Sequence, residues 1–190
     1  MSNKTRYIQS SQTFFHVYNR GADRAAIFFQ ERHYLDFVQR MKNAVDPQVL
    51  EIVAFCLMPN HYHLILYQKI PYAIPAFIRA VCEGYVKSVN LQYFRTGHLF
   101  EGRYRIKPIT ADEYLLHLAR YIHRNPIRAR LVTAVEAWQH SNYQCCISGI
   151  DDGVTSPGIL LGLAGGTREY QKFVEEYVDD DRKNVAGMLF

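Results

Sequence analysis

The sequence lacks any apolar run near the roughly 18 residues that a transmembrane helix needs, so we expect no membrane-spanning segment. Its first residues lack the apolar stretch of a secretory signal, and we expect a cytoplasmic protein. Cysteine is scarce: the four thiols show no Cys-x-x-Cys spacing, and two of them are adjacent in sequence. This pattern argues against a disulfide framework and favours reduced thiols. The four are Cys56, Cys82, Cys145 and Cys146.

The composition lacks the bias toward charged residues or toward glycine and proline that is typical of disordered or fibrous proteins. Hydrophobic residues make up 48% of the 190 residues, charged residues 21% and aromatic residues 14%, which is typical of a globular domain able to fold without a disulfide or metal. Charge is uneven: residues 79–130 hold ten Lys/Arg and four Asp/Glu, whereas residues 151–190 hold four and eight. The basic segment indicates either an anionic polymer as partner or a solvated helix face.

Hydrophobic periodicity predicts an α+β fold. Strands are expected at 14–18, 49–57, 61–67 and 104–109, and helices at 31–45 and 74–94. The order β-α-β-β-α-β predicts a ferredoxin-like (RRM-like) antiparallel sheet with helices on one face and the other face open. The nearly continuous apolar strand at 49–57 is typical of a strand buried on both sides.

A third helix is expected after the last strand. Thr110 and Glu113 have the spacing of a capping box, and Pro126 predicts that the helix ends near Arg124. Residues 131–190 read as a small, mostly helical extension.

His61 and His63 are the first candidate functional residues. Side chains two apart in a strand point to the same face, so both imidazoles can chelate one metal ion. The intervening Tyr62 points to the opposite face. Spacing alone equally allows two histidines that only form local hydrogen bonds.

Tyr121 and Asn125 are the second candidate pair. They lie about 40° apart on a helical wheel, beside the core-facing stripe of the third helix. This places a phenol next to a carboxamide, but Tyr121 packing its ring and Asn125 capping the helix would fit the same pattern. Four further histidines, which have no evident partner in the sequence, are expected at the surface: His98, His117, His123 and His140.

Three motifs together resemble the HUH-superfamily single-tyrosine transposases of the insertion-sequence type. They are FHVYNRG at 15–21, MPNHYHLI at 58–65 and YIHRNPIRARLV at 121–132, and Tyr121 comes 58 positions after His63. The segments GHLFEGR at 97–103 and WQHSNY at 138–143 are most similar to the REP-associated tyrosine transposases, a branch linked to repetitive extragenic palindromes. The resemblance covers residues 14 to about 145.

The resemblance implies a role for each matching residue. Tyr121 matches the nucleophile, His61 and His63 match the metal ligands, and Asn125 matches the polar residue that completes the metal site, with Mg²⁺ or Mn²⁺ as cofactor. His16, Asn19 and Arg20 match a recurring strand motif whose role stays open. Phosphate contacts are expected from the basic residues around the nucleophile, and Tyr104 or Tyr114 could stack on bases. The predicted DNA contacts are Arg103, Arg105, Lys107, Arg120, Arg124 and Arg128.

The resemblance implies a metal-dependent DNA strand-transferase that cleaves and rejoins single-stranded or hairpin DNA, including REP-type palindromes, through a 5′-phosphotyrosine. Residues 1–145 would form the catalytic domain and residues 146–190 an extension packed on it, in an oligomeric state left open. A replication-initiator or relaxase-like nickase, and a non-catalytic single-stranded nucleic-acid-binding protein, remain alternatives.

Overall fold

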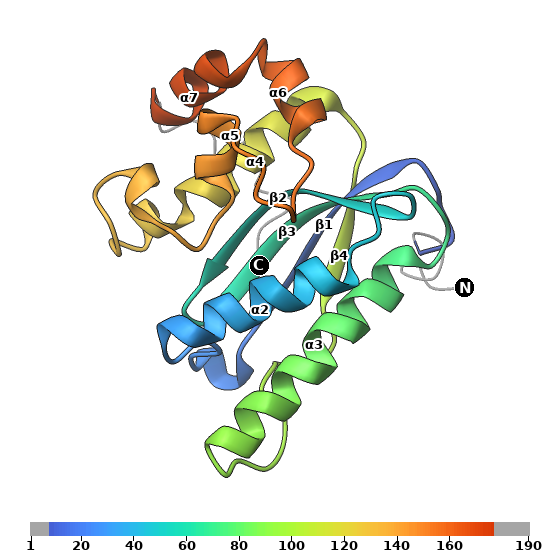
Figure 1. The fold of residues 1–190 in the computed structure, drawn as a ribbon, viewed down its shortest axis with the longest axis vertical. Coiled ribbons are helices and arrows are strands. Elements are labelled where there is room, and N and C mark those ends of the chain that lie inside the picture. The colour runs from blue at the N-terminus through green and yellow to red at the C-terminus, as the bar shows by residue number, and fades with distance from the viewer. Residues whose placement is uncertain (1–7, 177–190) are drawn as a thin grey trace.

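The computed structural model describes residues 8–176 of the chain. Four antiparallel strands form one sheet in the order β2-β3-β1-β4 (Figure 1). This order confirms the predicted ferredoxin-like sheet, and each strand lies within two residues of its expected bounds. The strands are β1 (Thr13–Arg20), β2 (Leu50–Met58), β3 (His61–Gln68) and β4 (Arg105–Ile109).

The first face of the sheet is covered by α2 (Glu31–Ala44) and α3 (Ala73–Gln92), which lie side by side (Figure 1). Their apolar sides close a core over inward-facing strand residues such as Phe15, Tyr62 and Leu64. A 3-10 turn, η1 (Ala22–Arg24), follows β1. Both helices agree with the predicted ranges because their apolar residues recur with helical spacing.

The second face of the sheet is covered as well, which corrects the expectation of an open face. It carries apolar residues, among them Val53, Cys56 and Ile65, that join a second core with the helices of the C-terminal half. These elements gather in the upper left of Figure 1. Burial on both sides explains why β2 is apolar almost throughout. The covering elements are α4 (Asp112–Arg128), η2 (Val135–Ala137), α5 (Tyr143–Ser148), α6 (Gly158–Ala164) and α7 (Thr167–Glu175).

Helix α4 differs from its prediction at both ends. Its N-cap is Ala111, and no side chain caps it, so the predicted capping box of Thr110 does not form. Two acidic residues occupy the first turn instead, where their negative charge interacts favourably with the positive end of the helix dipole. The helix also continues past Pro126 to Arg128. Proline removes only one hydrogen bond in this last turn, and its buried ring contributes packing.

The C-terminal helices pack against α4. Leu160 of α6 and the pair Tyr170 and Val174 of α7 are buried in the second core. The predicted boundary between residues 145 and 146 falls inside α5. The last part of the acidic tail, residues 177–190, lies outside the described residues. No helix within residues 8–176 has the length and apolarity needed to cross a bilayer.

Candidate active site

Strand β3 presents the two candidate histidines to the second face of the sheet. Its alternation places Tyr62 in the first core, whereas His61 and His63 face the side covered by α4. The two imidazole rings have centroids 5.0 Å apart and planes at 87°. The predicted juxtaposition of His61 and His63 is therefore present.

His61 is held in one tautomer. Its Nδ1 lies 2.7 Å from Asn60 Oδ1, and the Asn60 amide nitrogen donates to the Arg24 carbonyl. Because an amide oxygen can only accept, His61 Nδ1 carries the proton and Nε2 the lone pair. Burial, together with the positive charge of Arg20, lowers the pKa of His61 to about 4. His61 is a neutral imidazole near pH 7.

His63 contacts a further buried histidine, His16 on β1. The rings stack with centroids 5.1 Å apart, and His16 Nε2 lies 2.9 Å from His63 Nδ1. Burial, followed by the proximity of His16 and His61, lowers the pKa of His63 well below its usual range. Coordination by His63 would therefore involve its Nε2. The sequence left the role of His16 open, and the structure makes it the partner of a candidate ligand.

His61 and His63 could bind a divalent cation, but they would supply only part of its ligands. Two neutral imidazoles suit ions such as Mn²⁺, and amide or phosphate oxygens suit both Mn²⁺ and Mg²⁺. Within residues 8–176 no three His, Cys, Asp or Glu side chains are grouped so that they could hold a metal ion. An ion held by His61 and His63 would take its remaining ligands from amide, water or substrate oxygens.

Tyr121 on α4 lies beside His63. The ring centroids are 6.1 Å apart and the planes meet at 83°. Arg128, two turns further along the same helix, places its guanidinium carbon 4.9 Å from the Tyr121 ring centroid. Packing of α4 against the sheet thus brings a half-buried phenol, an imidazole pair and a permanent positive charge together.

Asn125 lies one turn after Tyr121 inside the helix and is only 8% exposed. Its position within α4 excludes the alternative that it caps the helix end. The buried Asn125 Nδ2 has no hydrogen-bond partner among the described residues. An unsatisfied amide N–H group is costly in a purely structural role. Because Nδ2 is a donor, it fits an acceptor such as a substrate phosphate oxygen, whereas Oδ1 is the atom of this side chain that could bind a metal ion.

The predicted DNA contacts divide into two groups. Arg105 and Lys107 lie on the edge strand β4, opposite Tyr18 and His16 of β1, and so share the face of the histidine pair. Arg105 is exposed, as is Arg103 in the preceding loop. Arg105 and Lys107, together with Arg128 over the Tyr121 ring, form a basic rim beside the histidine pair that could contact phosphates.

Arg120 and Arg124 instead connect α4 to α7. Arg120 is 7% exposed, donates to the Phe173 carbonyl and lies with its guanidinium carbon 3.9 Å from the Phe173 ring centroid. Arg124 donates to the Val174 carbonyl at 2.8 Å. These contacts satisfy carbonyls at the end of α7. Because Arg120 is buried in these contacts, the prediction that it binds a DNA phosphate is not supported.

A buried chain of hydrogen bonds around His123 was missed by sequence reasoning, which placed this histidine at the surface. His123 is fully buried, with Nε2 2.9 Å from Asn142 Oδ1 and Nδ1 2.8 Å from the Tyr170 hydroxyl. Asn142 also accepts from Phe55 N and donates to Val53 O of β2. The chain ties α7, α4 and β2 together, and no local pattern signals it. His98, by contrast, is exposed as expected.

Comparisons with known proteins agree with this arrangement. Residues 9–125 match the family described as IS200-like transposases. A Haemophilus influenzae protein named as a REP-associated tyrosine transposase is 26% identical over 120 residues, which cover 57% of this chain and 67% of that protein. A solved structure of a REP-associated tyrosine transposase bound to a REP hairpin superposes with a TM-score of 0.63 at 18% identity, covering 84% of this chain and 93% of the other.

Proposed function

The chain belongs to the IS200-like transposase family, and from this premise we propose that it cleaves and rejoins single-stranded or hairpin DNA through a covalent bond to Tyr121. One observation carries the proposal: residues 58 positions apart in sequence, His63 and Tyr121, meet with ring centroids 6.1 Å apart. A phenol beside neutral imidazoles and a guanidinium has the groups that phosphoryl transfer requires.

In the proposed reaction the Tyr121 hydroxyl gives up its proton and its oxygen attacks a backbone phosphorus. The new tyrosyl O–P bond forms as the P–O3′ bond breaks, and the leaving 3′ oxygen takes up a proton to become a hydroxyl. The DNA 5′ phosphate remains on Tyr121. A 3′-hydroxyl of another strand can then attack the same phosphorus and release the tyrosine, so the bond is exchanged rather than hydrolysed.

His61 and His63 would hold the cofactor, Mg²⁺ or Mn²⁺, with Asn125 as the candidate third ligand. When bound, a divalent ion withdraws charge from the phosphate oxygens and orients the phosphorus. Asn60 fixes the tautomer of His61, and His16 occupies Nδ1 of His63. Arg128 would supply positive charge beside the attacked phosphate.

Hairpin DNA is the proposed partner, because the structurally similar transposase was solved on a REP hairpin and this chain carries the basic rim beside Tyr121 and the histidine pair. Arg103, Arg105, Lys107 and Arg128 are the proposed phosphate contacts. Arg124 is a weaker candidate because it already holds an α7 carbonyl.

The test is incubation of the protein with labelled hairpin-containing single-stranded DNA and Mn²⁺, followed by denaturing electrophoresis. The wild type should give an SDS-resistant protein–DNA band, and Tyr121→Phe should bind DNA but give neither band nor cleavage. His63→Ala should lose cleavage at limiting Mn²⁺ and keep most of its DNA affinity. Cleavage by Tyr121→Phe without an adduct would mean that water is the nucleophile and would refute the proposal.

A further inference from the structure

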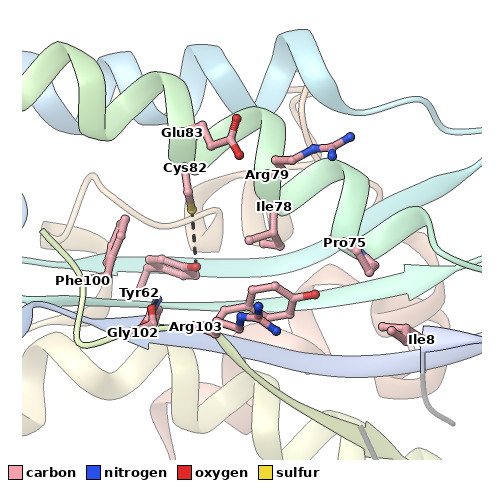
Figure 2. A pocket seen from close by; sticks show the side chains of 12 residues that line it. Ile8, Tyr62, Pro75, Ile78, Arg79, Cys82, Glu83, Phe100, Gly102 and Arg103 are labelled. Atoms are coloured by element: carbon pink, nitrogen blue, oxygen red, sulfur yellow. Dashed lines mark hydrogen bonds between the residues drawn. The ribbon is translucent and has the colours of Figure 1, made fainter. Parts of the chain in front are cut away.

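A cavity of about 610 Å³ lies on the first face of the sheet, away from the histidine pair. It is enclosed by α3, by the sheet and by the loop that precedes β4 (Figure 2). Its inner wall is mostly apolar, with Tyr62, Ile78 and Phe100 among the lining side chains. This volume is that of a small-molecule site rather than of a packing defect.

The cavity shares strand β3 with the active site. Tyr62 lines it from between His61 and His63, and its hydroxyl lies 3.7 Å from Cys82 Sγ of α3 (Figure 2). Because strand side chains alternate, the cavity and the histidine pair lie on opposite faces at the same level of the sheet. The half-buried Tyr104, directly before β4, also lines the cavity.

Two positive charges line the cavity from opposite sides. Arg79 comes from α3 and Arg103 from the loop before β4 (Figure 2). Both are exposed, and neither forms an ion pair or side-chain hydrogen bond that joins it to another residue in the 8–176 range. Glu83, one turn after Arg79, adds a hydrogen-bond acceptor at the same site.

We propose that this cavity binds one unpaired nucleotide of the DNA that the enzyme cleaves. The inference rests on the proposed function and assigns the cavity as a second contact with the same DNA. The base would stack on Tyr104, with Phe100 and Ile78 excluding water, while the Arg79 and Arg103 guanidinium groups hold the adjoining phosphates. Glu83 would accept from the amino or ring N–H groups of the base.

The chemistry and position of the cavity select this occupant. A paired base cannot enter, because its edges and both faces are already engaged in the duplex. A free phosphate would leave the apolar and aromatic wall uncovered and would be repelled by Glu83. The edge strand β4 carries Arg105 and Lys107 on the histidine side and is preceded by Tyr104 at the cavity. A DNA strand that crosses this edge can reach both sites.

The experiment measures the affinity of the full chain, in EDTA, for a hairpin oligonucleotide with single-stranded flanks. Each unpaired position is replaced in turn by an abasic residue. We expect one position, or two neighbouring ones, at which loss of the base weakens wild-type binding by about five-fold or more, the usual effect of losing a stacked base. For Tyr104→Leu and for Arg79→Gln, that abasic penalty should largely disappear.

Arg168→Gln on α7 serves as the matched control, because Arg168 is also exposed but does not line the cavity. It should keep the full abasic penalty. Suppose that the wild type forms the covalent adduct, but that every abasic position weakens the binding of Tyr104→Leu and Arg79→Gln as much as it weakens that of the wild type. The cavity proposal alone is then overturned. If the wild type binds no hairpin or single-stranded DNA, the proposed function fails and the cavity proposal with it.

Discussion

Removing the hydroxyl of Tyr170 tests the buried chain of hydrogen bonds that positions α4, the helix that carries Tyr121. Asn142 Oδ1 accepts from Phe55 N, so it is an oxygen, and His123 Nε2 must therefore carry a proton to bond to it. His123 Nδ1 is then an acceptor, and Tyr170 is its donor at 2.8 Å. Burial lowers the pKa of His123 to about 4, which keeps the ring neutral near pH 7.

Tyr170→Phe keeps the ring and its packing but leaves His123 Nδ1 buried without its donor. An unsatisfied buried acceptor costs about 1–3 kcal/mol of the free energy of unfolding. For a chain of this length, each kcal/mol lowers the melting temperature by about 2–4 °C. The variant should therefore melt roughly 2–12 °C below the wild type.

Tyr143→Phe is the matched control. Tyr143 is equally buried, but its hydroxyl donates to Glu175, an exposed carboxylate that water can satisfy. Its loss should cost less than about 1 kcal/mol. Thermal melts and urea titrations at pH 7, both followed by circular dichroism, measure the melting temperature and the free energy of unfolding of both variants. Equal stability of Tyr170→Phe and wild type, or a larger loss in Tyr143→Phe, would refute the hydrogen-bond assignment of the chain.

Three further predictions concern the site and its basic rim. His16→Phe removes the hydrogen-bond partner of His63 and should weaken Mn²⁺ binding by roughly 10- to 100-fold. His16→Gln restores an acceptor for His63 and should recover part of the lost Mn²⁺ affinity. Electron paramagnetic resonance of Mn²⁺ measures the affinity of both variants. Arg120→Ala should lower stability by about 1–3 kcal/mol with little effect on DNA affinity, and Arg128→Ala should do the reverse, as seen by pairing melting with fluorescence anisotropy. Raising salt from about 50 to 200 mM should weaken single-strand binding at least tenfold, with a log–log slope of about −0.7 per phosphate contacted; a flat response would mean that the basic segment is only a solvated face.

The local pattern of the sequence was sufficient to predict the sheet and the two helices that cover its first face. Alternation in β3 separates His61 and His63 from Tyr62 whatever the rest of the chain does. Helical spacing likewise predicts α2 and α3, because each buries a stripe of apolar residues. These features depend on neighbours within a few positions, so periodicity alone reveals them.

The ends of α4 were predicted wrongly because tertiary packing overrode local signals. The capping box at Thr110 and the stop before Pro126 are both reasonable local preferences. Burial of Asn125 and Pro126 against the rest of the protein extends the helix by a turn. That extra turn carries Arg128, which lies over the Tyr121 ring.

The sequence by itself determined the order of strands and helices and the pairing of the two histidines, since both follow from side-chain alternation and spacing. Only the tertiary structure decided what covers the second face of the sheet. Residues far apart in the chain meet there: His16 with His63, Tyr121 with His63, and His123 with Asn142 and Tyr170. Such contacts depend on how whole elements pack, because their energy comes from burial and hydrogen bonds between segments that no short window contains.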